Sequence, residues 1–255
     1  MKKVIWLVGS SQGIGFELTK YLLNSEYYVI ASSRTAESEE ALLNLRNLYS
    51  SHLRLLNLDV SNTERIPEKV AEAINCFGKI DVWVYNAGYY QPTKLSDSTD
   101  EIFQNTLNVN FLGCAYLMHA LLNQAAELIP SQWFWNISLA SQFGLPYGGS
   151  YSASKAALLN LAESLKPELE QRNIQLRVIN HGFVKTRLTL KNDFPMPGLM
   201  SAESAAQSIS QFIQAPPKHS FELTFPWGMT LFLKFLKHIP YRMAFYITRK
   251  ALKND

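Results

Sequence analysis

The start of the chain is its most constraining feature. An apolar run over residues 4–8 leads into the turn Gly9-Ser10-Ser11-Gln12-Gly13-Ile14-Gly15 and then into helix-period sequence over 15–24. Glycines allow close approach of the backbone to phosphates, and a helix N-terminus offers N–H groups and a partial positive charge. Strand, turn and helix in this order predict a dinucleotide site, although a turn that merely joins a strand to a helix can have the same spacing.

Short apolar runs alternate with helical segments along the rest of the chain. We predict strands at 3–8, 27–31, 53–58, 80–85, 132–137, 175–179 and 221–225, with helices over 15–24, 63–77, 100–126, 152–171 and 202–214. This alternation predicts an α/β fold, a doubly wound (Rossmann) parallel seven-stranded sheet with helices on both faces. We expect one domain over 1–225, with 226–255 as a helical extension packed on it, and a mobile loop over 185–200.

Composition excludes several classes of protein. The two cysteines, Cys76 and Cys114, have no CxxC or metal-ligand spacing, so we expect no disulfide, no metal site and a reducing, cytoplasmic environment. Two lysines precede the first apolar run, but that run is too short for a signal peptide or a membrane span. The net charge of +3 is too small to indicate a nucleic-acid partner.

The end of the second predicted strand bears on the choice between NAD and NADP. An acidic residue there would bind a ribose 2′-hydroxyl, whereas a basic residue would accommodate a 2′-phosphate. The sequence has Arg34 at this point and no acid before Glu37. The planar guanidinium of Arg34 can hold a phosphate, and Ser10 or Ser33 can add a hydroxyl. NADP is therefore favoured, with a solvated loop role for Arg34 as the alternative.

Tyr151 and Lys155 lie at the start of a predicted helix, four residues apart and so on one face. A tyrosine with a pKa of about 10 is a poor base at neutral pH, but a nearby ammonium group stabilises the phenolate. The pair is a candidate proton donor. Tyrosine and lysine at this spacing are also common on helix surfaces, so the pair alone decides little.

Further motifs accompany this pair in a fixed order. They are Asp59-Val60, Asn86-Ala87-Gly88, Asn110, Ser138 thirteen residues before Tyr151, and then Gly182, Val184 and Thr186. Together with the glycine turn, over about residues 3–225, these motifs resemble the short-chain dehydrogenase/reductase family.

The resemblance implies an NADP(H)-dependent oxidoreductase, either a carbonyl reductase or an alcohol dehydrogenase. Tyr151 would exchange a proton with the substrate oxygen, and Ser138 would hydrogen-bond to that oxygen. Lys155 would lower the pKa of Tyr151 and hold the nicotinamide ribose, while Asn110 would anchor a water that relays protons. The cofactor would contact Gly9, Ser10, Ser11, Gln12, Gly13, Ile14, Gly15, Ser33, Arg34, Asp59, Val60, Asn86, Ala87, Gly88, Tyr151, Lys155, Val184 and Thr186.

The expected partners follow from the same resemblance. They are a small-molecule carbonyl or alcohol, apolar or lipid-like in character, and further copies of the chain in a homodimer or homotetramer. A catalytically idle NADP(H)-binding sensor is the alternative function, because a fold of this kind can serve recognition alone.

One motif departs from the family, which usually has Pro-Gly after the sixth strand. This chain has Asn180-His181-Gly182 instead. Loss of the proline frees φ and restores an N–H group, so we expect the loop near the nicotinamide to be less rigid. His181 receives no catalytic role, because a single loop histidine is more often a packing or solvated residue.

The C-terminal segment mixes large apolar residues with basic ones. We expect one or two short helices there, broken at Pro240. Their apolar face requires cover, and the protein's own cleft or a partner subunit is favoured over a bilayer. The charged residues after Pro226 are Lys234, Lys237, Arg242, Arg249, Lys250, Lys253 and one acid, Asp255.

Overall fold

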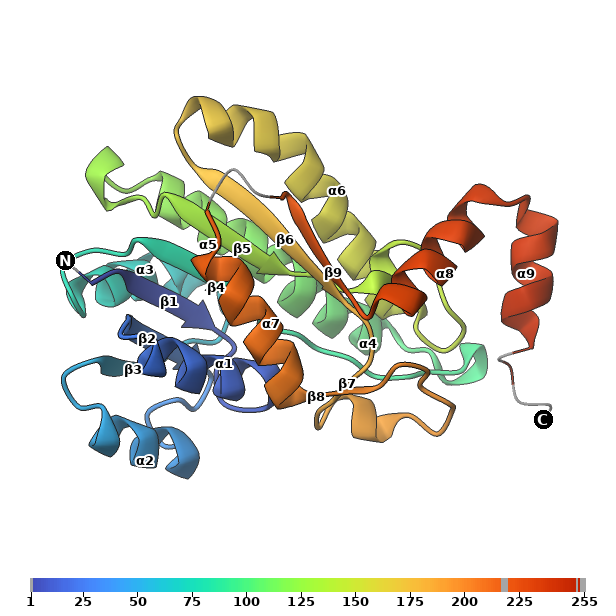
Figure 1. The fold of residues 1–255 in the computed structure, drawn as a ribbon, viewed down its shortest axis with the longest axis horizontal. Coiled ribbons are helices and arrows are strands. Elements are labelled where there is room, and N and C mark those ends of the chain that lie inside the picture. The colour runs from blue at the N-terminus through green and yellow to red at the C-terminus, as the bar shows by residue number, and fades with distance from the viewer. Residues whose placement is uncertain (1, 217–219, 251, 253–255) are drawn as a thin grey trace.

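The computed structural model, which describes residues 2–216, 220–250 and 252, is built around a seven-stranded parallel sheet (Figure 1). The strand order is β3-β2-β1-β4-β5-β6-β9, and all neighbouring pairs are parallel. The predicted α/β doubly wound fold is confirmed. The strands are β1 (Val4–Val8), β2 (Tyr28–Ser33), β3 (Leu53–Asn57), β4 (Val82–Tyr85), β5 (Gln132–Asn136), β6 (Gln175–His181) and β9 (Glu222–Phe225).

Helices cover both faces of this sheet and enclose two hydrophobic cores (Figure 1). One face carries α1 (Gly13–Asn24), α2 (Glu40–Leu48) and α7 (Ala202–Gln214). The other carries α3 (Ile66–Asn75), α5 (Gly113–Leu122) and α6 (Gly149–Gln171), with α4 (Asp100–Leu107) packed on α6. Short 3-10 turns span Thr63–Arg65, Leu95–Asp97, Ala126–Leu128, Leu139–Ser141 and Thr189–Lys191.

Strand β1 shows why its sequence is an unbroken apolar run. Val4, Trp6 and Val8 point into one core, and Ile5 and Leu7 point into the other. All five side chains are buried, as expected for a central strand of a parallel sheet that is covered on both faces. The order of strands reverses between β1 and β4, where doubly wound folds bind their ligands.

The structure refines several predicted boundaries. The helix predicted over 100–126 consists of α4, a five-residue π-helical segment Asn108–Leu112, and α5. Helix α2 was missed. The 185–200 stretch is bounded by β7 (Val184–Lys185) and β8 (Met200–Ser201), which pair as a separate two-stranded sheet.

Strand β6 is two residues longer than predicted, because Asn180 and His181 pair with Thr224 and Phe225 of β9. His181, which stands where the family has its proline, therefore continues a regular strand. The N–H of Gly182 donates to the Phe225 carbonyl at 2.7 Å. The expected extra freedom of this loop stays a prediction.

The C-terminal extension forms two helices, α8 (Trp227–His238) and α9 (Tyr241–Arg249), separated at Ile239 and Pro240. This confirms the predicted break at Pro240. In Figure 1 the pair stands at one end of the molecule, beyond the carboxyl ends of β6 and β9. Lys253 and Asp255 lie outside the described residues. In the ranges that the structure describes, no helix has both the length and the apolar character needed to cross a bilayer.

Candidate active site

The glycine turn is shaped by close backbone contacts. Gly9 has φ of +92°, and a Cβ there would lie 2.5 Å from the backbone nitrogen of Ala87. A Cβ on Gly15 would lie 1.9 Å from the Gly9 carbonyl oxygen. The first turn of α1 contains no acidic residue, and the side chain of Gln12 does not cap it. The helix N-terminus therefore keeps N–H groups for an anion, which fits a pyrophosphate.

A cavity of about 1030 Å³ runs along the carboxyl ends of the strands, from this turn to α8. Its volume is at the upper end of the roughly 300–1,000 Å³ usual for ligand pockets. Most of the predicted cofactor residues line it: Gly9, Ser11, Gln12, Gly13, Ile14, Ser33, Arg34, Asp59, Val60, Asn86, Ala87, Gly88, Tyr151, Lys155, Val184 and Thr186. Ser10 and Gly15 lie behind the turn, where both Ser10 N and Oγ donate to the Ser32 carbonyl.

Four charged side chains lie near the end of the cavity where the adenosine of a dinucleotide would lie. Arg34 is exposed and lines the wall. Glu37 is held away from it by Asn57, whose Nδ2 donates to Glu37 Oε2 at 2.9 Å. Glu39, to which the sequence assigned no role, also lines the cavity. Asp59 accepts from both Ser61 N and Ser61 Oγ, so its carboxylate is fixed at the rim.

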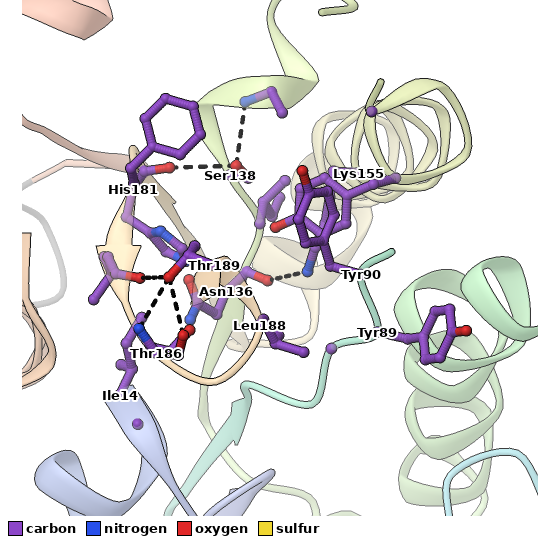
Figure 2. A pocket seen from close by; sticks show the side chains of 18 of the residues that line it. Ile14, Tyr89, Tyr90, Asn136, Ser138, Lys155, His181, Thr186, Leu188 and Thr189 are labelled. Carbon is purple, nitrogen blue, oxygen red and sulfur yellow. Dashed lines mark hydrogen bonds between the residues drawn. The ribbon is translucent and has the colours of Figure 1, made fainter. Parts of the chain in front are cut away.

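A chain of hydrogen bonds joins the glycine turn to helix α6. Asn86 Nδ2 donates to the Gly9 carbonyl at 2.6 Å, and Asn136 Nδ2 donates to Asn86 Oδ1 at 2.6 Å. Lys155 Nζ then donates to the Asn136 carbonyl at 2.9 Å, as Figure 2 shows. The position of Lys155 is therefore coupled to that of the turn through Asn136 and Asn86.

Ser138, Tyr151 and Lys155 come together in the middle of the cavity. Ser138 follows β5, and its Oγ accepts from Ala140 N at 3.2 Å and donates to the His181 carbonyl at 3.3 Å (Figure 2). Tyr151 and Lys155 share one face of α6, with Lys155 Nζ 5.8 Å from the centre of the Tyr151 ring. This is the constellation expected from their spacing.

Burial sets the protonation of this group. It raises the pKa of Tyr151 to about 12, a rise that a hydrogen bond with Ser138 opposes. It lowers the pKa of Lys155 to about 8. At neutral pH the phenol is therefore protonated and most of the lysine is charged. Without cofactor, burial dominates the pKa of Tyr151 and raises it. The lowering of this pKa by Lys155 stays a prediction for the enzyme with its cofactor bound.

Asn110 is fully buried within the π-helical segment. Its Oδ1 accepts from Tyr89 N at 2.7 Å, and its Nδ2 donates to the Tyr89 carbonyl and to Ser154 Oγ, each at 2.9 Å. It lies behind the cavity wall and ties the loop after β4 to α6. Its expected part in a proton relay stays a prediction.

Two side chains of the cavity wall, Tyr90 and His181, received no role from the sequence. The Tyr90 ring meets the Tyr151 ring edge-on at 5.0 Å, and its hydroxyl donates to Asn192 Oδ1 at 2.8 Å. His181 stacks on Phe225 at 6.2 Å, and burial lowers its pKa to about 4, so it is neutral at physiological pH. Tyr90 closely follows the Asn86-Ala87-Gly88 motif in the sequence. That motif could have indicated that Tyr90 enters the site.

The far end of the cavity is apolar. Met229, Phe232 and Leu233 of α8 line it, with Ile247 of α9. Leu188 and Phe194 from the stretch between β7 and β8 lie on the same wall. The extension is thus part of the apolar end of the cavity.

Comparisons with known proteins agree with this geometry. A family model described as short chain dehydrogenase matches residues 3–194. The chain is similar to carbonyl reductase family member 4 of Xenopus laevis, at 29% identity over 91% of this chain and 100% of that protein. It is also similar in structure to a short-chain dehydrogenase from Streptomyces avermitilis, with 24% identity, a TM-score of 0.81 and coverage of 98% and 97%. ElxO, solved with NADP bound, has 25% identity, a TM-score of 0.78 and coverage of 90% and 99%. The chain therefore belongs to the short-chain dehydrogenase/reductase family and is an oxidoreductase.

Proposed function

We propose that this protein is an NADP(H)-dependent carbonyl reductase or alcohol dehydrogenase that acts on an apolar, lipid-like ketone, aldehyde or secondary alcohol. One observation carries the proposal: a single cavity joins the glycine turn, the Ser138, Tyr151 and Lys155 side chains, and an apolar wall. The first supports dinucleotide binding, the second proton transfer at an oxygen, and the third an apolar substrate.

Preference for NADP rests on the adenosine end. Arg34 lines the cavity there and forms no ion pair within the described part of the chain, so its guanidinium is available to a 2′-phosphate. Glu37 is engaged by Asn57. Glu39 remains within the wall and is the group most able to repel that phosphate. The similar protein ElxO binds NADP, which supports the same choice here.

The bound cofactor would supply or accept the hydride at the substrate carbon. In the reduction direction Ser138 Oγ would turn from the His181 carbonyl to donate to the substrate oxygen. Tyr151 would give its phenolic proton to that oxygen, which suits a group whose pKa stands near 12. The ammonium of Lys155 would stabilise the phenolate that is left. Asn110 would hold the loop and α6 in register and anchor the relay water.

Assembly into a homodimer or homotetramer also belongs to the proposal. Phe103 and Leu107 of α4 and Tyr116 of α5 are exposed large apolar side chains of one continuous helical segment. Burial of such a row against its copy would remove it from water. The mass measured by light scattering tests this, and a Leu107→Glu variant should lower it.

A substrate panel tests the reaction. Ketones, aldehydes and long-chain 3-oxo compounds are supplied with NADPH, and its absorbance is followed with the wild type and with Tyr151→Phe. Turnover of apolar carbonyls by the wild type and its loss in the variant are expected. Tight NADPH binding without turnover of any compound would instead favour the idle sensor.

A further inference from the structure

The extension carries an unusual concentration of exposed apolar side chains. Among the described residues, nine exposed large apolar side chains lie between 227 and 252, against seven in all the rest. Trp227 is 76% exposed, Tyr241 71% and Tyr246 64%. Eight of these nine side chains, those of α8 and α9, form what we call the C-terminal apolar face: Trp227, Leu231, Phe232, Phe235, Tyr241, Met243, Phe245 and Tyr246.

The protein's own domain covers only the opposite side of α8. Leu233 and Leu236 are fully buried in a cluster with Leu139 and Phe143. Trp227, Leu231 and Phe235 follow one another at four-residue spacing and form a row on the outer side. The protein's own domain therefore covers the inner side of α8, as expected, whereas the apolar side chains on the outer side of α8 are exposed to water.

Positive charge accompanies this face. Lys237, Arg242, Arg249 and Lys250 are exposed, while Lys234 pairs with Glu222 at 3.3 Å. No acidic residue occurs between 226 and 252, although residues 1–225 contain twenty acidic and eighteen basic residues. The extension is thus the cationic part of a chain whose body is slightly anionic.

This charge decides between two occupants of the face. A two-fold contact with a second copy would bring two cationic extensions together, and a one-sided contact with the body would form a ring or an open chain of molecules. An anionic lipid surface matches both properties, because amphipathic helices with basic and aromatic residues lie in the bilayer interface. We propose that the C-terminal apolar face docks on the surface of an anionic phospholipid bilayer.

The position of the cavity gives this docking a use. Phe232 is 45% exposed on the face and also lines the cavity, and Ile247 of α9 lines it as well. The substrate end of the cavity therefore lies beside the surface that meets the bilayer. An apolar carbonyl dissolved in the membrane would have a short path to Tyr151. This consequence rests on the proposed function, whereas the docking itself is independent of it.

Vesicle sedimentation of the full chain tests the docking. Vesicles of phosphatidylcholine with about a quarter phosphatidylserine are compared with pure phosphatidylcholine, at about 0.05 M and about 0.5 M salt. We expect binding to the anionic vesicles at low salt, with at least about tenfold less at high salt or on the neutral vesicles.

Matched variants locate the contact. Lys237→Glu with Arg242→Glu should weaken binding at least about tenfold, whereas Arg46→Glu with Arg172→Glu makes the same charge change on the body and should leave it unchanged. Trp227→Ser with Tyr246→Ser should also weaken it. Leu48→Ser with Leu95→Ser, two exposed body positions, is the control for that pair.

Three results would overturn the docking. They are an intact protein that ignores anionic vesicles at low salt, equal losses from the extension and body variants, and a fall in solution mass caused by Trp227→Ser with Tyr246→Ser. The last would assign the face to a second copy. Carbonyl reduction in detergent-free buffer, measured on the same samples, reports the proposed reaction separately.

Discussion

The two ends of the cavity are built by different means. At the dinucleotide end the backbone itself forms the wall, and Gly9, Gly15 and Ala87 approach so closely that no Cβ fits between them. At the substrate end, side chains from α8, α9 and the stretch between β7 and β8 form the wall. Backbone contacts tolerate almost no substitution, whereas apolar side chains can be exchanged for others of similar volume.

This difference separates what is general from what is particular in the molecule. The dinucleotide end and the proposed catalytic trio, Ser138, Tyr151 and Lys155, would define a reaction that many substrates could undergo. The substrate end would decide which of them enters, because α8 and α9, which lie outside the 3–194 match to the family model, contribute Met229, Phe232, Leu233 and Ile247 to its apolar wall. Changes at the two ends should therefore alter different measured quantities.

The largest effect is expected from a methyl group at the backbone wall. Gly15→Ala would bring its Cβ within 1.9 Å of the Gly9 carbonyl, so the free energy of unfolding should fall by about 3 kcal/mol or more. Gly228→Ala in α8 meets nothing within 4 Å and should raise it by up to about 1 kcal/mol. Urea denaturation measures both, and similar changes in the two variants would remove the contrast between the ends.

The catalytic trio should respond in rate alone. Tyr151→Phe keeps the ring and removes the proton donor, so kcat should fall by at least about 100-fold. The dissociation constant for NADPH, measured by fluorescence, should change little, since the glycine turn is untouched. Tyr116→Phe, an exposed position on α5, is the control and should behave as the wild type. Near-normal turnover by Tyr151→Phe would refute the assigned proton donor.

Most residues that the sequence assigned to the dinucleotide end line one cavity, because local pattern determines their positions. The apolar run of β1, the glycines and the i, i+4 pair of Tyr151 and Lys155 each carry their own periodicity or spacing. Arg34 was found in the same way, from its place after β2. In each case the residues that matter are neighbours in the chain.

The rest depends on contacts between distant residues. Tyr90 enters the site through its edge-on contact with Tyr151 and its bond to Asn192, which is 102 positions away. The two-residue strands β7 and β8 exist only because they meet each other. Helix α2 had a signal, with Leu42 and Leu45 three residues apart, but its short length made the pattern easy to overlook.

A moderate effect is expected at the adenosine end. Arg34→Ala removes a charge-assisted contact to the 2′-phosphate and should weaken NADPH binding by about 1.5 to 3 kcal/mol. NADH lacks that phosphate, so its affinity should stay nearly the same. Arg46→Ala on α2 is the matched control. Equal losses for NADPH and NADH, measured by titration, would remove Arg34 from the cofactor site.

The pH dependence should report Lys155, which stands between the two ends. Because burial lowers the pKa of Lys155 to about 8, the ammonium group loses its charge as pH rises through that value. The neutral amine no longer stabilises the Tyr151 phenolate. Tyr151, with a pKa of about 12, stays protonated over the same range. We expect kcat/KM for reduction to fall about tenfold per unit above pH 8. A profile that stays level to pH 10 would contradict this.

The smallest effect is expected at the substrate end, because each side chain there is only one of several apolar side chains that line the wall. Phe232 is half-buried against the cavity, so Phe232→Ala should cost an apolar substrate that reaches it about 1 kcal/mol, or roughly fivefold in KM. A compact carbonyl that stops at Tyr151 should be unaffected, and so should the affinity for NADPH. Leu231→Ala, the exposed neighbour that faces away from the cavity wall, is the matched control. If the compact and the long substrate lost the same factor, Phe232 would be acting through the fold of α8, and the two ends of the cavity would not be independent.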